Sequence, residues 1–288
     1  MLFRSYGYLG QVFRQRREGG AEFLQAGIED LGEKDTATAD ARSLADAHAL
    51  LSCTLPEHSL SITLGDQHIF EAVLAGLGLP RGWQKRLARA FGSAEQIELA
   101  LADLANPAQA ADPDPAVAGF LANGDAERLA AHVALVMEEA ALPVTAGRSP
   151  QDIAQRLIEK ASLRSVRLSD DTLAALKQFL AIQEPLEEAS DVLAAFATKA
   201  GVSLGNALPA FAARAAAITA HGLPQGSIIY DAGFGRPLDY YTGLVFEIRS
   251  GKSQPLAGGG RYDRLLTMLG AAQPIPGVGF SVWIDRIA

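Results

Sequence analysis

The chain has 288 residues, of which 49% are hydrophobic, so it can bury a full core in one or two domains. Its formal net charge of −8 argues against a surface built to neutralise nucleic-acid phosphates, because such surfaces concentrate lysine and arginine. The single cysteine, Cys53, permits no intrachain disulfide, the histidines are scattered, and no apolar run reaches the ~18 residues that span a bilayer. We therefore expect a cytoplasmic protein with no cofactor, no bound metal, and no nucleic-acid or membrane partner.

The first thirty residues predict a hairpin of two strands. Apolar and polar residues alternate on both sides of a polar loop, 15–22, which contains Gly19 and Gly20. A helix is expected over 40–51, because its apolar residues share one face and Asp40 is placed to cap its start. The alternating residues 60–66 predict one more strand.

Residues 68–223 are rich in alanine and leucine at helical spacing, with breaks at 106–107 and 112–115. Strands return at 227–230 and 244–248, and a final strand and helix begin near Val278. Strands at both ends with helices between them predict an α+β protein whose antiparallel sheet is interrupted by a helical insertion. The expected division is 1–66 for the first part of the sheet domain, 67–224 for the insertion and 225–288 for the second part of the sheet domain.

The segment 235–247 carries the most functional information. It reads Gly-Arg-Pro-Leu-Asp-Tyr-Tyr-Thr-Gly-Leu-Val-Phe-Glu, and Gly-Gly-Gly-Arg-Tyr-Asp follows at 258–263. In an extended strand Tyr240 and Tyr241 face opposite ways, so one would line a pocket while the other packs beneath it. Consecutive glycines are tolerated where φ is positive or where a ligand approaches the backbone. Composition alone favours a hairpin with aromatic packing and a Gly-rich turn, but the order of the residues favours a binding site.

This order resembles the histidine-specific motif of histidyl-tRNA synthetases and their non-synthetase paralogues, in which Arg-Gly-Leu-Asp-Tyr-Tyr precedes a strand and Gly-Gly-Arg-Tyr-Asp follows. Two further blocks occur in the family's order. Residues 8–14 and 23–29 resemble the two strands of class II synthetase motif 2, and residues 276–286 resemble motif 3. The matches cover about a third of the chain. They imply the class II aminoacyl-tRNA synthetase-like fold, a mostly antiparallel sheet flanked by helices.

Residues at matching positions are expected to bind histidine. In the strand 23–29, Gln25, Gly27 and Glu29 share one face, so the two polar side chains lie roughly 13 Å apart with a notch between them. Glu29 would take the ammonium group of a small amino acid, and Gln25 would read its carboxylate or a ring nitrogen. Without the resemblance, a solvated polar face on an edge strand would be preferred. The resemblance adds further candidates from the histidine motif: Arg236 at the reacting carboxylate, and Tyr240, Tyr241 and Tyr262 at the imidazole end, one of which is expected only to pack.

Arg14 and Arg286 match the arginines that hold the adenylate α-phosphate and ATP in class II synthetases, and a guanidinium fork suits both tasks. A surface salt bridge is the alternative for each. Synthetases read Phe-Arg-X-Glu in motif 2, but Arg16 replaces the acid here, the loop is shorter, and Glu22 stands at a basic position. Pro237 also replaces the usual glycine beside the motif arginine. Positioning of ATP would suffer from these changes, so we expect vestigial nucleotide contacts and no catalytic residue.

By this resemblance, we expect the sequence to begin inside the first strand of motif 2, without the motif 1 region, and to stop after motif 3, without the anticodon-binding domain of the synthetases. Retained amino-acid contacts with degraded nucleotide contacts are typical of ATP phosphoribosyltransferase regulatory subunits. The resemblance therefore implies a non-catalytic subunit that binds L-histidine, regulates a short ATP phosphoribosyltransferase catalytic subunit in the first step of histidine biosynthesis, and dimerises within a hetero-oligomer. Two alternatives stay open: a histidyl-tRNA synthetase fragment, and a histidine-binding module with another partner.

Overall fold

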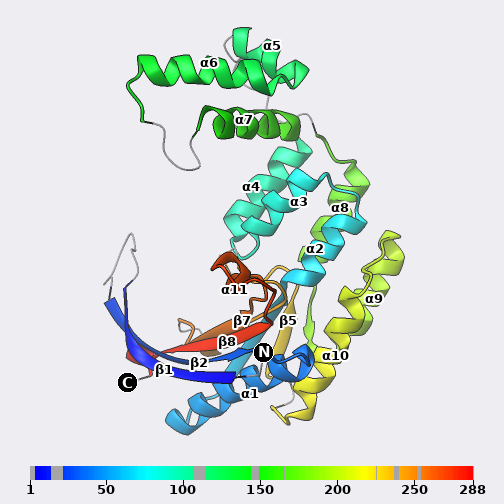
Figure 1. The fold of residues 1–288 in the computed structure, drawn as a ribbon. Helices are drawn as coiled ribbons and strands as arrows, with labels where there is room; N and C mark the ends of the chain where they lie inside the picture. The colour runs from blue at the N-terminus through cyan, green and yellow to red at the C-terminus, as the bar shows by residue number, and fades with distance from the viewer. Residues whose placement is uncertain are drawn as a thin grey trace.

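The computed structural model describes residues 4–13, 22–106, 115–143, 149–164, 166–224, 226–236, 240–251 and 254–287. The predicted positions Arg14, Arg16 and Pro237 lie outside these ranges, as does most of the loop 15–22. Eight strands form one sheet in the order β1-β2-β8-β7-β6-β3-β5-β4 (Figure 1). The strands are β1 (Arg4–Phe13), β2 (Glu22–Leu31), β3 (Leu60–Asp66), β4 (Gln183–Pro185), β5 (Ile228–Asp231), β6 (Leu244–Ser250), β7 (Ala257–Arg261) and β8 (Gly277–Trp283).

The sheet is mostly antiparallel, since β3 and β5 form its one parallel pair within the described ranges. The predicted α+β class is confirmed. The predicted hairpin is confirmed as well, because β1 and β2 pair along their whole length from Arg4↔Leu31 to Phe13↔Glu22. Strand β3 has the predicted bounds. The sequence pattern located these strands because side chains along a strand alternate between the two faces of the sheet.

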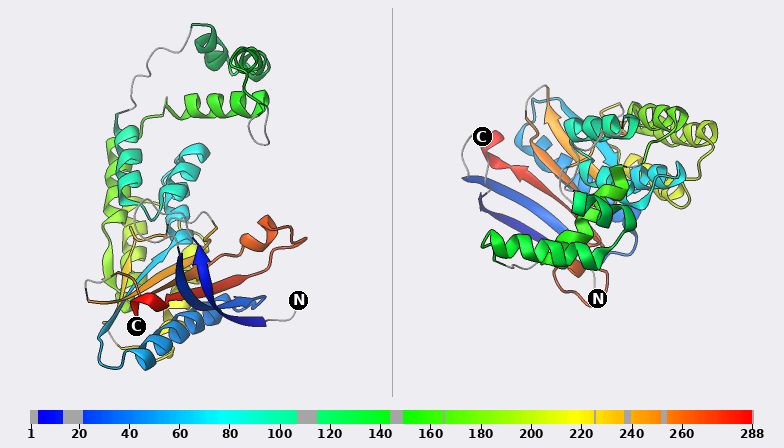
Figure 2. Two further views of the ribbon diagram at one scale, coloured as in Figure 1. Left: turned by 90° about the vertical axis from the view of Figure 1, so that its left-hand side faces the viewer. Right: turned by 90° about the horizontal axis from the view of Figure 1, so that it is seen from above.

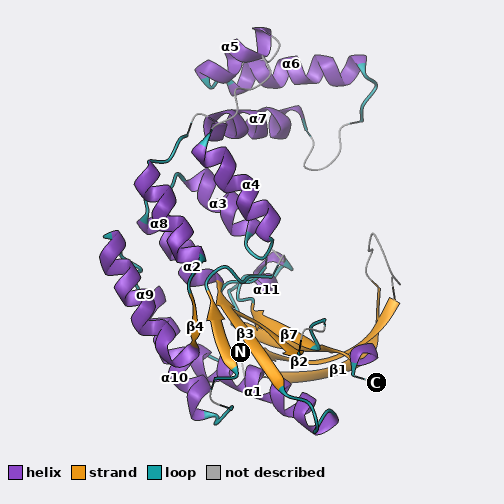
Figure 3. Cartoon of the chain, turned by 180° about the vertical axis from the view of Figure 1, so that it is seen from behind, coloured by secondary structure: helices purple, strands orange, loops and turns teal. Residues whose placement is uncertain are grey.

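The helices are α1 (Thr36–Thr54), α2 (Gln67–Gly76), α3 (Arg81–Ala90), α4 (Ala94–Ala105), α5 (Pro115–Asn123), α6 (Ala126–Glu139), α7 (Pro150–Arg164), α8 (Asp170–Leu180), α9 (Leu186–Ala200), α10 (Ala207–Ala220), α11 (Leu265–Met268) and the 3-10 turn η1 (Ile284–Arg286). Helix α1 lies under one face of the sheet with α10 beside it (Figure 1). Figure 3 shows α8, α9 and α10 along the flank where β4 lies. Helices α5, α6 and α7 lie far from the sheet (Figure 2) and have a small core of their own.

The start of α1 corrects one prediction. Asp35, and not Asp40, caps the helix, and its carboxylate accepts a hydrogen bond from the backbone nitrogen of Thr38 at 3.1 Å. Asp40 lies a full turn further on and is completely buried. The cap prediction was wrong because a single acidic residue near a helix start suits both a cap and an ion pair, and only the tertiary structure decides between them.

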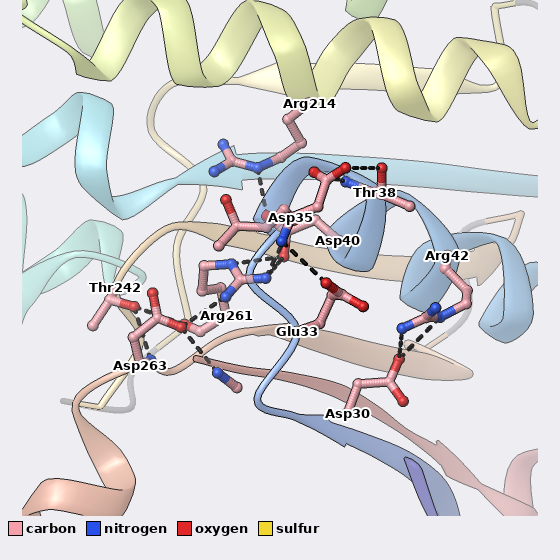
Figure 4. A network of polar contacts seen from close by, with 12 residues as sticks. Asp30, Glu33, Asp35, Thr38, Asp40, Arg42, Arg214, Thr242, Arg261 and Asp263 are labelled. Atoms are coloured by element: carbon pink, nitrogen blue, oxygen red, sulfur yellow. Dashed lines mark hydrogen bonds and ion pairs between the residues drawn. The ribbon is translucent and has the colours of Figure 1, made fainter. Parts of the chain in front are cut away.

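Asp40 instead forms the centre of a buried ion network between α1, α10 and β7 (Figure 4). Its two carboxylate oxygens lie 2.6 Å from Arg214 Nε and 2.6 Å from Arg261 Nη2. Arg214 also pairs with Asp66 at the end of β3, and Arg261 with Asp263 at 2.7 Å. Burial alone would lower the pKa of Arg214, but the charges of Asp66 and Asp40 outweigh it and raise that pKa. Arg214 therefore remains charged and paired in the core.

No described helix combines the length and the apolar composition that crossing a bilayer requires. Likewise, the described part of the chain brings together no group of three or more histidine, cysteine, aspartate or glutamate side chains that could hold a metal ion.

The ion network generates the first prediction. Asp40→Asn keeps the shape of the side chain but leaves Arg214 and Arg261 short of one buried negative charge. We expect it to lower the free energy of unfolding by about 3 to 5 kcal/mol, measured by urea denaturation. Asp103→Asn is the matched control, because Asp103 pairs with Arg86 at the surface and should contribute less than about 1 kcal/mol. Equal effects of the two substitutions would contradict the central role of Asp40.

Candidate functional site

A pocket of about 310 Å³ lies on the face of the sheet opposite α1. The strand register places Gln25, Gly27 and Glu29 on this face, while the alternate residues of β2 point to the α1 side. The pocket is lined by Tyr8, Gln25, Glu29, Leu31, Tyr240, Tyr241, Gly258, Tyr262, Leu265, Leu266, Gly279, Phe280 and Ser281. Five of the six predicted histidine-binding residues are in this lining, and Arg236 lies directly beside it, against Gly258.

Glycines on this face of β2 and β8 make room for two of the lining side chains. Gly27 pairs with Tyr8 on β1, and a Cβ atom at Gly27 would lie 2.7 Å from the Tyr8 hydroxyl. A Cβ atom at Gly279 would overlap the Glu29 carboxylate. The notch predicted between Gln25 and Glu29 exists in the backbone, but the ring of Tyr8 occupies it.

The glycines of β7 act in the same way. A Cβ atom at Gly258 would overlap the guanidinium of Arg236, and one at Gly260 would lie 2.8 Å from the Tyr241 ring. The turn that composition favoured for this run was wrong, because these glycines belong to a strand in the interior of the sheet, and none of them has a positive φ. Their function here is to let large side chains lie flat on the sheet.

Glu29 is the carboxylate at the bottom of the pocket. It lies mostly below the surface, and the hydroxyl of Tyr262 donates a hydrogen bond to it. Burial raises the pKa of Glu29, the hydrogen bond from Tyr262 opposes that shift, and the nearby charge of Asp30 adds to it. Burial, together with the charge of Glu29, also raises the pKa of Tyr262, so its proton stays on the phenol. The pocket thus holds one poorly compensated negative group.

Three tyrosine rings form one wall. The rings of Tyr240 and Tyr241 are 4.7 Å apart between centroids, and Tyr262 meets Tyr240 edge to face at 6.1 Å. The prediction that Tyr240 and Tyr241 face opposite ways was wrong, because both precede β6 and lie outside any strand. All three tyrosines line the pocket, and the expectation that one of them only packs stays a prediction.

Arg236 is anchored next to the pocket. Its Nη1 atom lies 3.0 Å from Glu247 on β6, and its guanidinium lies 5.7 Å from the centroid of the Trp283 ring. Glu247 also pairs with Arg249 at 2.8 Å. Arg236 Nε is buried and has no hydrogen-bond partner among the described residues. One side of the guanidinium is therefore bound to the protein, and its Nε donor is unsatisfied.

Gln25 lies at the same end of the pocket, opposite Trp283 on β8. The residue is 4% exposed, and its side chain forms no hydrogen bond to another described residue. The Trp283 Nε1 donor is also buried without a described partner. Buried polar groups in folded proteins are normally hydrogen-bonded, so these groups and Arg236 Nε mark a place where a polar ligand can bind.

Of the two predicted nucleotide contacts, the described one, Arg286, does not line this pocket. Arg14 lies outside the described residues. Arg286 stacks over Trp283 at 4.5 Å and donates a hydrogen bond to the backbone oxygen of Pro255. Its role toward a nucleotide stays a prediction.

Sequence reasoning missed Tyr8 and Ser281 as lining residues. Both become visible only from the register, since Tyr8 pairs with Gly27 and Ser281 pairs with Gly27 and Gly258. The alternation of apolar and polar residues around Tyr8 predicts a strand. The length and sequence of the loop 15–22 do not determine which residue of the next strand pairs with Tyr8. A tyrosine opposite a glycine in a proposed hairpin would have been the signal to look for.

Known proteins share this architecture. Residues 4–148 and 151–287 match the family model described as histidyl-tRNA synthetase. A crystal structure of an ATP phosphoribosyltransferase regulatory subunit/histidyl-tRNA synthetase from Bacillus halodurans aligns with a TM-score of 0.60 at 20% identity, over 98% of this chain and 57% of that one. Histidyl-tRNA synthetase from Nostoc sp. PCC 7120 aligns with a TM-score of 0.61 at 16% identity, over 98% and 53%. The chain has the histidyl-tRNA synthetase-like class II fold and spans a little over half of these solved proteins.

Relatives with higher identity define the family more closely. The ATP phosphoribosyltransferase regulatory subunit of Mesorhizobium japonicum is 67% identical over 285 residues, which are 99% of this chain and 76% of the relative. That of Agrobacterium fabrum is 55% identical over 285 residues, again 99% and 76%. The chain belongs to the family of ATP phosphoribosyltransferase regulatory subunits.

Glu29 should make the stability of the protein depend on pH. Its raised pKa means that the folded state binds this proton more tightly than the unfolded state, so the free energy of unfolding should fall as the pH rises above about 4.5. Glu29→Gln removes the titration, and the variant should gain stability relative to the wild type through that window. Urea denaturation from about pH 4 to about pH 8 measures this difference. Glu22→Gln, on the exposed end of the same strand, is the control, and a pH-independent difference for Glu29→Gln would contradict the raised pKa.

Proposed function

We propose that this chain is a non-catalytic regulatory subunit that binds L-histidine in the pocket and controls an ATP phosphoribosyltransferase catalytic subunit. The observation that carries the proposal is the joint placement of Gln25, Glu29 and the three tyrosines around one small pocket. The name shared by the relatives at 53–67% identity supports the regulatory role. The proposal places the complex in the cytoplasm.

The pocket has complementary groups for each part of an α-amino acid. The buried carboxylate of Glu29 would bind the ammonium group, which would relieve its unfavourable burial. Gln25 and the unsatisfied Nε of Arg236 would hold the carboxylate end. Aromatic rings and the polar hydroxyls of Tyr240 and Tyr241 suit an imidazole. A volume of about 310 Å³ is at the small end of ligand pockets, as expected for a single amino acid.

Histidine binding can regulate a partner only if the affinity for histidine differs between two states of the assembly. The pocket is suited to such a difference because its walls come from several segments: β1 and β2, the residues before β6, and the residues around α11. A small shift of one segment relative to the others would change the contacts of Glu29 with Tyr262. The sign and size of the regulation depend on the partner.

The outer edge of the sheet is the surface that we propose for assembly. Strand β1 is ten residues long and pairs on one side only among the strands that the structure describes. It exposes Tyr6 at 49%, Leu9 at 69% and Phe13 at 70%. Long edge strands with exposed apolar side chains favour association with another polypeptide. This supports self-dimerisation within a hetero-oligomer.

Removal of the Glu29 charge tests the histidine site. Glu29→Ala should weaken L-histidine binding by about 2 to 4 kcal/mol, because the ligand ammonium would lose its partner in a partly desolvated pocket. Isothermal titration calorimetry measures the affinity, and Glu22→Ala, on the same strand but exposed, should leave it unchanged. Unchanged affinity in Glu29→Ala would place the ligand elsewhere.

The regulatory role is tested by mixing the subunits. We expect the chain alone to form no phosphoribosyl-ATP, and a short catalytic subunit with this chain to form it in a histidine-dependent way. Phosphoribosyl-ATP formation is measured with each component alone and with both. The chain should also give no histidine-dependent exchange of pyrophosphate into ATP. Activity of the chain alone, or robust exchange, would favour an enzyme over a regulator.

A further inference from the structure

A second pocket lies beyond the tyrosine wall of the first. Its volume is about 510 Å³, and it lies between α2, α3 and the segment around α11. Tyr241 is the one lining residue that the two pockets share. We call it the basic pocket, and its lining residues are Gln67, Glu71, Arg81, Gln84, Lys85, Ala88, Arg89, Tyr241, Arg264 and Met268.

Four of these side chains are cations. Helix α3 contributes Arg81, Lys85 and Arg89 at intervals of four residues, so they form one row along the helix. Arg264 adds a fourth cation from the N-cap of α11. Glu71 is the one acid of the lining, and it is already bound by Arg264 at 3.3 Å and by the amide of Gln67 at 3.1 Å.

Two acids near the row on α3 form no ion pair with it within the described part of the chain: Glu71, which is bound by Arg264 and Gln67, and Glu159, which lines a neighbouring pocket with the row. Arg81, Lys85 and Arg89 form no ion pair with another described residue. Arg86, on the other side of the same helix, does pair with Asp103. Like charges four residues apart destabilise a helix, and Arg81 at the first turn also opposes the helix dipole. In a chain of net charge −8, this concentration of positive charge is local to the pocket.

We propose that the basic pocket is a second ligand site, which binds a small molecule that carries clustered phosphate groups. Arginine and lysine side chains in a concave site raise the local concentration of anions and bind phosphate oxygens by charge-assisted hydrogen bonds. Gln84 and Gln67 place further polar groups in the same lining, and Tyr241 with Met268 gives the rest of the ligand an aromatic and apolar wall. The inference does not depend on histidine binding, because none of the four cations lines the first pocket.

The test uses the full chain and pyrophosphate as the probe, with calorimetry at constant ionic strength. The wild type should bind pyrophosphate saturably at one site. Lys85→Gln should raise the dissociation constant by about tenfold, the loss of roughly one charge-assisted hydrogen bond, and the triple variant R81Q/K85Q/R89Q should abolish binding. These side chains are exposed, so the variants should fold, and unchanged urea denaturation curves verify it. Competition by ATP or by ribose 5-phosphate distinguishes a nucleotide from a sugar phosphate as the ligand. If neither competes, the site is specific for pyrophosphate.

Two controls separate this site from other anion sites. Lys177→Gln removes an exposed lysine of α8 that does not line the pocket and should leave the dissociation constant unchanged. Arg286→Gln removes a predicted nucleotide contact that lines neither pocket and should also have no effect. No saturable binding by the wild type, an equal loss in Lys177→Gln, or a loss in Arg286→Gln but not in Lys85→Gln would overturn the proposal. Failure of histidine to bind would leave it standing.

Discussion

The buried carboxylate of Asp40 is the constraint on which the rest of the structure depends. It binds Arg214 and Arg261, which are 174 and 221 residues away in the sequence. Because a buried charge without partners is strongly unfavourable, the first helix, α10 and β7 must come together for any of them to be stable. Helices α2 to α9 come between α1 and α10 in the sequence, so this contact brings the chain back to the sheet after that long helical excursion.

The network also fixes the position of the pocket. Arg261 points to the α1 side of β7. On the opposite side, which is the pocket side, Gly260 lies against the ring of Tyr241 and Tyr262 lines the pocket. Asp263, which pairs with Arg261, accepts a hydrogen bond from the backbone nitrogen of Gly277 at 3.0 Å. Its own backbone nitrogen donates to Thr242 at 3.1 Å. The segments that carry Tyr241, Tyr262 and Gly279 are therefore held at one point, beneath the place where their side chains meet.

The fold class and much of the candidate site follow from the sequence, because both rest on local patterns. Alternation of apolar and polar residues predicts β3 to the residue. The resemblance of the motifs to those of the family groups Gln25, Glu29, Tyr240, Tyr241 and Tyr262, which line one pocket. The boundaries of the expected helical insertion, 67–224, stay a prediction. Strand β4 lies within these boundaries but pairs with β5 and so belongs to the sheet.

What could not be predicted depends on contacts between distant segments. The capping role expected for Asp40 was locally reasonable, but two arginines from distant parts of the chain determine its role. The glycines of β7 look like a turn in sequence, and only the side chains of Arg236 and Tyr241, packed on them, explain why they form a strand. Tyr8 was missed because its importance arises from pairing with Gly27 across a hairpin whose register the sequence does not specify.

The electrostatics of the site favour binding over catalysis. To stabilise a transition state, an enzyme needs a cation that is not already paired and that is positioned where negative charge develops on the reacting group. The charge of Arg236 is already paired with Glu247. Its unsatisfied Nε can still donate a hydrogen bond that orients a ligand. Glu29 has the opposite character, since its burial leaves a negative charge that a ligand ammonium would compensate. In the proposed function, the ammonium group of an intact amino acid would compensate the carboxylate of Glu29, and the ligand would regulate the partner subunit through a difference in affinity between two states of the assembly.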